Sequence, residues 1–326
     1  MGKLKWGLLS TARINRSVIP SIRLSKRSEL VGVASRNLGT AEAYGKNWDI
    51  PLAFGSYEAL VGDPGINVVY ISLPNHLHAE WAIKCAIAGK HVLCEKPLAL
   101  SAIDVDRIIE ASRKRQVVVA EAFMYRHHPQ TLMVMDLLNR QAIGNMLTVK
   151  GTFTFSLTHP NDVRLNPEMG GGSIWDVGCY PISYTRFVVA AEPVEVFGWQ
   201  VLGLTGVDEA FMGQLRFANG LLAQVESGFR SPYRTRMEFV GTTGSIEVSK
   251  PFKPELDSRI EIQYGDGAES IKIPNKDLYQ GEIEDMENAV LDGKLQLISL
   301  ETSRGNAAVI NALIESAKTG RPVMLT

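Results

Sequence analysis

The alternation of strand-like and helix-like segments over the first 122 residues most strongly limits what this chain can fold into. Short runs rich in β-branched and aliphatic residues occur at Lys5–Ser10, Leu30–Ser35, Asn67–Leu73, His91–Glu95 and Val117–Ala122, with helix-like segments between them, most clearly at His76–Ala88 and Ala102–Arg113. Strands that alternate with helices pair in parallel through crossover connections. Their continuous apolar character fits a sheet covered on both faces. The pattern predicts a doubly wound parallel sheet.

The pattern changes near Phe123, where hairpin signals replace the alternation. Segments 146–157, 194–202, 207–217, 221–229 and 234–248 are predicted to be strands, and we expect helices at Ser173–Ala190, at 281–291 and at Ser299–Lys318. Ala218-Asn219-Gly220 is the strongest turn signal, and consecutive hairpins make an antiparallel sheet. The sequence therefore predicts an α/β protein of two domains. Residues 1–122 form the first, and residues 123–326 form an α+β domain with a large open, mainly antiparallel sheet, whose last helix is a candidate to pack back on the first domain.

Composition excludes several classes of partner. The 326 residues include 34 Lys+Arg and 35 Asp+Glu, a formal charge of −1, which gives no electrostatic footprint for nucleic acid. No apolar stretch approaches the roughly 18 residues that a membrane span needs, and the N-terminal run Trp6–Leu9 is too short for a signal peptide. The cysteines, Cys85, Cys94 and Cys179, are odd in number and lack C-x-x-C spacing. We expect reduced, buried cysteines in a cytoplasmic protein, and no metal site.

Two strand ends are candidates for dinucleotide binding. The first strand runs into Gly7-Leu8-Leu9-Ser10-Thr11-Ala12 and then a helix, where dinucleotide-binding units place a glycine-rich turn. Ser10 and Ala12 stand where the second and third glycines belong, so an ordinary strand-to-helix turn stays open as an alternative. The second strand ends at Ser35-Arg36, where NAD-binding folds place an acid. A guanidinium can instead bind the 2′-phosphate of NADP, which we favour over a merely solvated arginine.

Reactive side chains follow two further strands of the predicted parallel sheet. The strand at 67–73 ends in Pro74-Asn75-His76-Leu77-His78, and the strand at 91–95 ends in Glu95-Lys96-Pro97. Doubly wound folds bind ligands at the carboxyl ends of their strands. A partly desolvated lysine there can hold a substrate hydroxyl and favour its ionised form. The alternative is a surface lysine paired with Glu95.

Three motifs, taken together, resemble one oxidoreductase family. They are Glu95-Lys96-Pro97, the upstream Pro74-Asn75-x-x-His78, and the segment from Gly170 to Pro181 with its Asp176-x-x-x-Tyr180 spacing. Their order and spacing resemble the glucose–fructose oxidoreductase / inositol dehydrogenase / MocA (Gfo/Idh/MocA) family over essentially the whole chain. Tyr180, together with the segment from Glu121 to Arg126, looks most like the branch of dimeric dihydrodiol dehydrogenases and NADP-dependent xylose dehydrogenases. The resemblance implies a Rossmann domain followed by an open antiparallel sheet, which members commonly pair into dimers or tetramers.

The resemblance also implies the catalytic residues. These are Lys96, the acid–base residue Tyr180, and Asp176 as a supporting carboxylate. The spacing agrees, because residues four apart on a helix project from one face. A free tyrosine, with a pKa of about 10, is a poor base at neutral pH, and a nearby lysine cation would lower that pKa. We therefore expect Lys96 and Tyr180 to meet at the nicotinamide, although they come from different domains.

The remaining candidates divide into two groups. The expected cofactor-binding residues are Gly7, Ser10, Thr11, Ala12, Arg13, Ile14, Ser35, Arg36, Leu73, Asn75, His78, Glu95, Lys96, Pro97 and Arg126; the expected substrate-binding residues are Lys96, Arg164, Asp176, Tyr180 and Tyr279. Three of these keep a structural alternative. Arg126 could cap a helix or form a salt bridge, Arg164 could be a solvated loop charge, and Tyr279 could be a packing aromatic.

The predicted function is that of an NAD(P)-dependent oxidoreductase, with NADP preferred. It would transfer a hydride between the nicotinamide and the hydroxyl or carbonyl of a sugar, a sugar derivative or a cyclic polyol such as a dihydrodiol. Two alternatives come from the same family: a glycosidase that keeps NAD bound, and a cofactor-sensing regulator without catalysis. We expect a small-molecule substrate, no nucleic-acid or membrane partner, and a homodimer or homotetramer formed through the C-terminal sheet.

Overall fold

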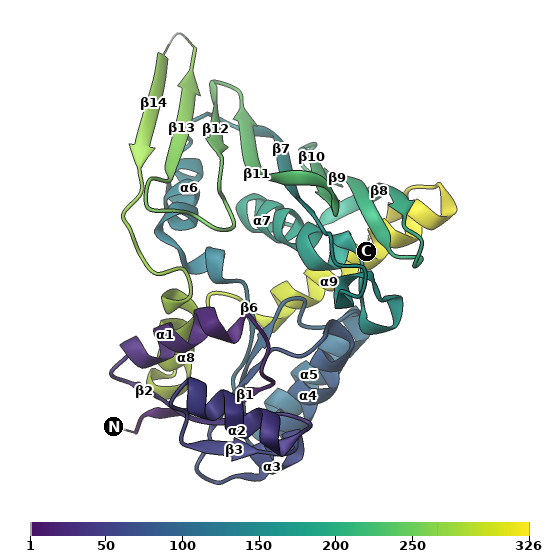
Figure 1. Cartoon of the computed structure of the whole chain (residues 1–326). Coiled ribbons are helices and arrows are strands. Elements are labelled where there is room, and N and C mark those ends of the chain that lie inside the picture. The colour runs from purple at the N-terminus through teal and green to yellow at the C-terminus, as the bar shows by residue number, and fades with distance from the viewer. Residues whose placement is uncertain (1, 266, 326) are drawn as a thin grey trace. The chain divides into compact units, whose positions relative to one another are not determined.

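The computed structural model describes residues 2–265 and 267–325, which form two compact units (Figure 1). The first unit comprises Met1–Met124 and Tyr279–Arg304, and the second comprises Tyr125–Leu278 and Gly305–Thr326. The chain thus passes from the first unit to the second near residue 124, returns for one segment, and leaves again. Each unit has its own sheet and its own core.

The first unit is built on a six-stranded sheet in the order β3-β2-β1-β4-β5-β6, with every pair parallel. Its strands are β1 (Leu4–Leu9), β2 (Ser28–Ala34), β3 (Leu52–Phe54), β4 (Val68–Ile71), β5 (His91–Glu95) and β6 (Val119–Ala122); its helices include α1 (Asn15–Leu24), α2 (Leu38–Asn47), α3 (Tyr57–Gly62), α4 (Asn75–Ile87), α5 (Ala102–Arg115) and α8 (Gln280–Asp292). The strand order reverses between β1 and β4, the switch point where such sheets bind ligands. The predicted doubly wound fold is confirmed.

Apolar side chains on both faces hold this sheet. On the face covered by α1 and α8, Trp6, Leu8 and Tyr70 from the strands pack against residues that include Ile19 and Met286, all of them at most 1% exposed. Fully burying one such side chain stabilises the fold by about 1.5–3 kcal/mol. The core therefore explains why the strands are apolar without alternation, and why α8 (Figure 1) belongs to this unit.

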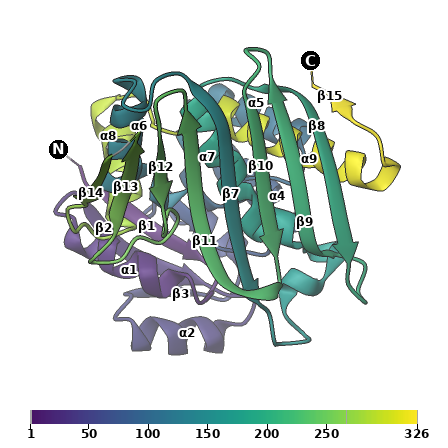
Figure 2. The same ribbon diagram turned by 90° about the horizontal axis from the view of Figure 1, so that it is seen from above.

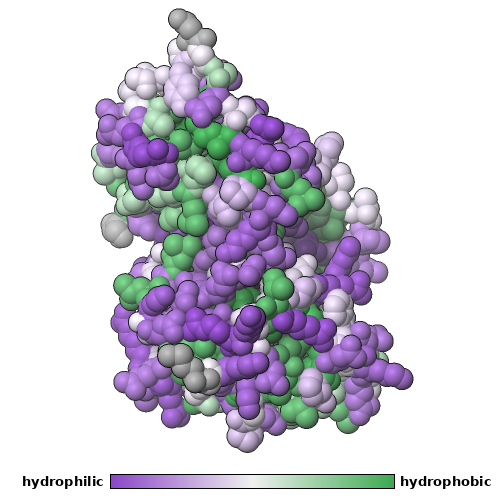
Figure 3. All heavy atoms as spheres, turned by 90° about the vertical axis from the view of Figure 1, so that its left-hand side faces the viewer, coloured by the Kyte–Doolittle hydropathy of each residue, from purple (hydrophilic) through white to green (hydrophobic). Residues whose placement is uncertain are grey.

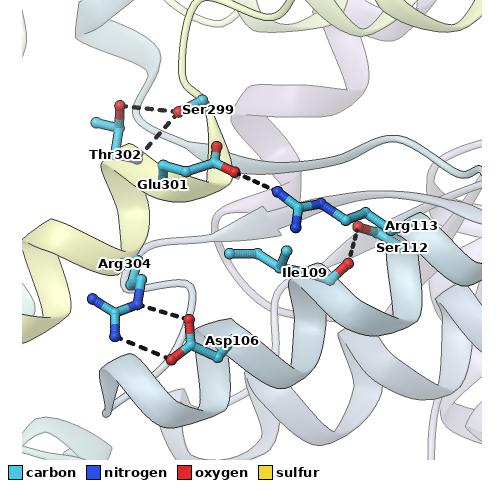
Figure 4. Close-up of polar contacts among 8 residues, drawn as sticks. All are labelled: Asp106, Ile109, Ser112, Arg113, Ser299, Glu301, Thr302 and Arg304. Carbon is cyan, nitrogen blue, oxygen red and sulfur yellow. Dashed lines mark hydrogen bonds and ion pairs between the residues drawn. The ribbon is translucent and has the colours of Figure 1, made fainter.

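The first turn of α9 (Leu300–Thr319) is tied to α5 by charged pairs (Figure 4). Arg304 donates to both carboxylate oxygens of Asp106, at 2.7 and 3.2 Å, and Arg113 donates to Glu301 at 3.0 Å. The Ser299 hydroxyl accepts from the Thr302 backbone N–H at 3.2 Å, which caps the start of the helix. These pairs are solvent-exposed, so they orient the segment, whereas the buried α8 contacts stabilise it.

The second unit is built on a nine-stranded sheet in the order β14-β13-β12-β11-β7-β10-β9-β8-β15 (Figure 2). Its strands are β7 (Met146–Ser156), β8 (Pro193–Leu202), β9 (Asp208–Phe217), β10 (Leu222–Gly228), β11 (Arg230–Gly241), β12 (Gly244–Val248), β13 (Arg259–Tyr264), β14 (Gly267–Lys272) and β15 (Val323–Met324); its helices include η1 (Met124–His127), α6 (Pro129–Asn139), η2 (Val163–Leu165), η3 (Pro167–Met169), a π-helical turn η4 (Ile174–Gly178) and α7 (Cys179–Val189). This sheet confirms the predicted large, mainly antiparallel sheet of the second domain.

Two details of the predicted sheet are wrong. The single strand expected at 234–248 is two strands, β11 and β12, because the Gly241-Thr242-Thr243-Gly244 sequence makes a turn between them. A continuous hairpin series is not formed either, since β7 lies between β10 and β11 and pairs with β10 in parallel. The hairpin at Ala218-Asn219-Gly220 does form, with Gly220 at φ +86° joining β9 to β10.

Helices cover one face of this sheet and leave the other open (Figure 2). The helix-covered face buries Val196, Leu215 and Val225, and the backbone of β8 at Gly198 accepts close packing by Leu313 of α9. On the opposite face the alternate side chains point outward, and Trp199 and Met212 are 55% and 48% exposed. An antiparallel sheet commonly has one solvated face, but large apolar side chains on it are unusual.

Hydrophilic side chains dominate the surface drawn in Figure 3, with hydrophobic residues gathered in smaller patches between them. A surface of this kind is ordinary for a folded chain, because polar atoms cannot cover a protein completely. Among the described residues, no helix combines the length and the apolar character that crossing a membrane requires.

Candidate functional site

The turn after β1 is stabilised by a small network of buried polar groups. Ser10 has φ +122°, a backbone conformation that favours glycine, and so carries strain of about 1–3 kcal/mol. Its hydroxyl accepts from the Ala12 N–H at 3.1 Å and lies 2.8 Å from the Ser72 hydroxyl. The Asn15 side chain donates to the Ser10 carbonyl at 2.8 Å and accepts from Ser72 at 2.7 Å. Serine thus occupies a glycine position by virtue of its own hydrogen bonds.

The same turn fits a pyrophosphate. Within the described chain, the backbone N–H groups of Thr11, Arg13 and Ile14 donate to no other group, while the helix α1 begins directly after them. Free amides ahead of a helix N-terminus form the usual cradle for a dinucleotide phosphate. Gly7 packs closely as well, because a Cβ there would meet Leu60 at 2.8 Å. The residues present therefore match the cofactor that the turn was predicted to bind.

Arg36 follows β2 at the same edge of the sheet and is exposed. The described residues give it no ion-pair partner, and the next residue, Asn37, caps α2 by accepting from the Thr40 N–H at 3.0 Å. A fixed loop with an unneutralised guanidinium suits a phosphate ligand.

Within the described residues, no group of three or more His, Cys, Asp or Glu side chains could hold a metal ion.

Lys96 is part of a loop whose neighbouring residues are held by three side chains of the first unit. Tyr70 of β4 donates to Glu95 Oε1 at 2.5 Å, and the buried Glu121 of β6 accepts from the Leu98 N–H at 2.9 Å. His78 of α4 lies 2.7 Å from the Pro97 carbonyl oxygen. The residues before and after Lys96 are therefore fixed from three different elements, which leaves the lysine in a half-buried position at the carboxyl edge of the sheet.

His78 bridges the ends of β4 and β5. Its Nδ1 lies 2.7 Å from the Pro97 oxygen and its Nε2 lies 2.7 Å from the Leu73 oxygen, while the side chain is 1% exposed. Burial lowers the pKa of His78, although the two carbonyls act in the opposite direction. The ring nitrogens are thus both occupied by backbone groups. The structure thus gives His78 the role of linking the Leu73 and Pro97 carbonyls, and its contact with the cofactor stays a prediction.

The second unit carries Asp176 and Tyr180 on one continuous helical segment, η4 followed by α7. Gly172, at φ +115°, makes the turn that starts it. Arg164 Nε donates to Asp176 Oδ2 at 2.6 Å, and its Nη1 donates to Asp162 at 3.2 Å. Asp176, followed by Asp162, raises the pKa of Arg164, while burial acts against this. Arg164 is therefore fixed by two carboxylates, an arrangement that sequence reasoning did not anticipate.

Tyr180 is 5% exposed and packs within an aromatic cluster of the second unit. Its ring centroid lies 5.3 Å from those of Phe153 and Phe252 and 5.7 Å from that of Tyr125. The Tyr125 hydroxyl also donates to the Tyr180 carbonyl at 3.4 Å. Such ring pairs each add about 0.5–1.5 kcal/mol beyond burial, so the phenol ring has little freedom to move.

Two further predicted residues have defined packing. Arg126 is 2% exposed, lies 3.6 Å from the centroid of the Phe187 ring, and donates to the Ser183 hydroxyl at 3.3 Å. Tyr279 packs against the hydrophobic core cluster of the first unit, just before α8. The contact of Tyr279 fits its alternative as a packing aromatic. The contacts of Arg126 are with a ring and a hydroxyl, which are neither the helix cap nor the salt bridge of its alternative. The cofactor role of Arg126 and the substrate role of Tyr279 stay predictions. Lys96 lies in the first unit and Tyr180 in the second, so their expected meeting also stays a prediction.

Sequence reasoning missed the residues that hold the reactive segments in place. Tyr70 is hidden inside an apolar strand. Asp208, which accepts from Ser173 and Ile174 at the start of the segment with Tyr180, begins a strand with no motif around it. Asp162 precedes Arg164 in a polar loop, where its capping of η2 could have been predicted from the rule that Asp favours helix N-termini.

The fold and the site define a class of protein. A parallel sheet with a turn that fits a phosphate at its switch point, and a lysine at the same edge, are typical of dinucleotide-dependent enzymes. Two family models match the chain: an oxidoreductase family with an NAD-binding Rossmann fold over residues 4–123, and a GFO/IDH/MocA C-terminal domain over residues 131–247. The chain belongs to the Gfo/Idh/MocA family of oxidoreductases.

Relatives named for an enzymatic activity match three quarters or more of the chain. A D-xylose 1-dehydrogenase (NADP(+)) of Haloferax volcanii is 35% identical and covers 99% of this chain and 100% of its own. A trans-1,2-dihydrobenzene-1,2-diol dehydrogenase of Xenopus laevis is 34% identical over 75% of this chain and 74% of its own. The crystal structure of KijD10, a 3-ketoreductase from Actinomadura kijaniata in complex with NADP and TDP-benzene, is similar with a TM-score of 0.92 and 28% identity, covering 97% and 98% of the two chains. These findings confirm the predicted family, branch and fold class.

Proposed function

We propose that the protein is an NADP-dependent dehydrogenase or reductase acting on the hydroxyl or carbonyl of a sugar, a sugar derivative or a cyclic polyol. The observation that carries the proposal is the loop around Lys96, which Tyr70, His78 and Glu121 fix at the carboxyl edge of a dinucleotide-binding sheet. Xylose and dihydrodiol dehydrogenases among the relatives support the substrate class. On this proposal residues 1–122 bind the cofactor and residues 123–326 bind substrate and partner subunits.

The bound nicotinamide would supply the hydride acceptor or donor. This chain's own residues would manage the proton. In oxidation, Tyr180 accepts the proton of the substrate hydroxyl, and Lys96 favours the ionised forms of both oxygens by its positive charge. Asp176, which accepts from Arg164 at 2.6 Å, would be the supporting carboxylate that accepts from a second substrate hydroxyl. Reduction reverses these transfers.

The preference for NADP rests on Arg36. Its guanidinium is exposed at the end of β2, and the position lacks the acid that would bind a free ribose 2′-hydroxyl. A guanidinium pairs with phosphate through two charge-assisted bonds, so NADP should bind more tightly than NAD. A binding titration with both cofactors tests this, and tighter binding of NAD would refute it.

The decisive experiment combines a substrate screen with a lysine variant. Aldoses, ketoses, inositols and aromatic dihydrodiols are offered with each cofactor, and reduction is followed by nicotinamide absorbance. Lys96→Met should then lower kcat by two or more orders of magnitude while NADP binding is largely kept, within the range of general acid–base effects. Lys84→Met is the matched control, since Lys84 forms an exposed pair with Glu80. Undiminished turnover by the Lys96 variant would refute the proposed proton chemistry.

The open face of the second unit supports an oligomer. Phe197, Trp199 and Leu222 line an apolar groove on that face, together with the charged Glu195 and Arg216. We propose that two copies pair these sheets in a homodimer or homotetramer, because apolar patches of this kind mark interfaces. Sedimentation of the native chain and of Trp199→Glu tests this proposal, because a glutamate on the apolar groove should weaken the association of the copies.

The three buried free cysteines fit a reducing compartment, and we propose the cytoplasm.

A further inference from the structure

Asp208 lies at the start of β9 and binds the beginning of the segment that carries Asp176 and Tyr180. The residue is 7% exposed. Oδ2 accepts from the Ser173 hydroxyl at 2.6 Å and from the Ile174 N–H at 2.9 Å. The Ser173 hydroxyl also lies 2.9 Å from that of Ser227 on β10. Side chains from two strands therefore meet on the first residue of this helical segment.

The helical segment packs closely against the two strands that carry Asp208 and Ser227. A Cβ on Gly172 would lie 2.2 Å from Asp208 Oδ1, and a Cβ on Gly178 would lie 3.0 Å from the Ser227 hydroxyl oxygen. Glycines at both positions thus let the helical segment approach the two strands closely. Contacts at Ser173 and at Gly178 fix the segment before Asp176 and again between Asp176 and Tyr180.

The charge of Asp208 suits this position. Backbone N–H groups at the start of a helix carry partial positive charge, and a carboxylate there satisfies donors that would otherwise lack a partner. Burial raises the pKa of Asp208 to about 6, although the hydrogen bonds from Ser173 and Ile174 act in the opposite direction. A buried acid is costly to keep, so its presence calls for a reason beyond core packing.

We infer that Asp208 is a positioning residue for the reaction, acting through Ser173 and Ile174 to fix the register and orientation of the segment that presents Asp176 and Tyr180 to substrate. The inference rests on the proposed function, because it assigns Asp208 a part in that same site. It assigns no contact between Asp208 and substrate. A misplacement of about 1 Å in catalytic groups can reduce rates by about a hundredfold, so a fixed start of the helix matters for turnover.

Graded variants of Asp208 test the inference by kinetics. Asp208→Asn keeps an oxygen that can accept from Ser173 and Ile174, so its kcat should stay within about fivefold of the native value. Asp208→Leu has a similar size and no acceptor, so its kcat should fall at least about thirtyfold while the NADP dissociation constant stays within about twofold. Glu209→Gln is the control, because Glu209 is the adjacent residue and pairs with exposed Arg230. A native kcat in Asp208→Leu would overturn the inference.

Hydrogen exchange provides a second readout that does not depend on activity. Amide exchange in a peptide covering residues 173–178 should be faster in Asp208→Asn and in Ser227→Ala than in the native protein, and unchanged in Glu209→Gln. These milder variants decide the matter if Asp208→Leu does not fold, since native amide exchange over residues 173–178 in both of them would overturn the inference. If the native protein oxidises no tested compound, the proposed function fails, while the exchange result still supports or overturns the role of Asp208 in fixing the segment.

Discussion

Replacing Tyr70 with Phe removes a single hydroxyl from the core of the first unit and leaves the ring in place. Tyr70 is 0% exposed, and its hydroxyl donates to Glu95 at 2.5 Å, one residue before Lys96. Burial, followed by repulsion from Glu95 and Glu282, raises the Tyr70 pKa well above its ordinary value. The phenol therefore keeps the proton that it donates throughout the neutral pH range.

The expected magnitude follows from the charge of the acceptor. A hydrogen bond to an ionised group contributes about 1.5–3 kcal/mol to stability, and Tyr70→Phe takes this donor from the Glu95 carboxylate. The ring stays, so no sizeable cavity adds to the cost. We expect the free energy of unfolding to fall by about 2 kcal/mol, which corresponds to roughly a thirtyfold change in the unfolding equilibrium. We also expect kcat to fall, because Tyr70 of β4 then no longer holds Glu95, the residue before Lys96.

Urea unfolding followed by tryptophan fluorescence measures the change, with Trp6 and Trp81 reporting on the first unit. Tyr44→Phe is the matched control. Tyr44 packs against the same core cluster, and its hydroxyl has no hydrogen-bond partner among the described residues. That variant should change the midpoint little. If Tyr70→Phe shifts the midpoint no more than Tyr44→Phe does, at an unchanged m-value, the argument for the Tyr70–Glu95 bond is wrong.

Three further predictions concern the backbone and one buried acid. Ser10→Ala should be less stable than Ser10→Gly by about 1–2 kcal/mol in urea unfolding, because both lose the hydroxyl and only alanine keeps the strain at φ +122°. Gly171→Ala should lose about 1–3 kcal/mol and lower kcat, because its Cβ would lie 2.4 Å from the Arg164 carbonyl oxygen and the loop must move; native kcat and stability would contradict this. For Asp208, the pKa rises from 3.8 to about 6 on folding, so the folded state holds the proton more tightly and stability should fall by about 2 kcal/mol as pH rises from 4 to 6. Asp208→Asn should remove that slope, and an unchanged slope would contradict the assignment.

The fold could be predicted largely from local pattern, and the errors have local causes. The predicted bounds of the strand His91–Glu95 agree with those of β5, because its apolar run ends at the charged residues Glu95 and Lys96. Strand β3 has three residues and α3 has six, too short for a periodic signal to emerge. The parallel pairing of β7 with β10 depends on where β7 enters the sheet, and no local pattern encodes that order.

The site could be predicted where chemistry and motif coincide. Lys96, Asp176 and Tyr180 were found because reactive side chains follow strand ends or share a helical spacing. Their supports could not be found, since Tyr70 and Asp208 look like an ordinary strand aromatic and an ordinary turn acid in the sequence. Their importance depends on long-range contacts, 25 residues apart for Tyr70 and Glu95 and 35 for Ser173 and Asp208.

In both units, side chains of core elements restrain the segments that carry the reactive residues. Reactive groups in loops and first helical turns lack the full set of backbone hydrogen bonds that would hold them in a regular element. The first unit supplies the missing restraints to residues 95–98 from Tyr70, His78 and Glu121, and the second supplies them to Ser173 and Ile174 from Asp208. Each restraint comes from a strand or helix of the core, so it is independent of the polar loop that contains Arg164. Substitutions in that loop that keep the Arg164–Asp176 bond can therefore change substrate preference while the proton-transfer groups keep their places, and an activity lost through Asp208 would not be regained by changing the loop.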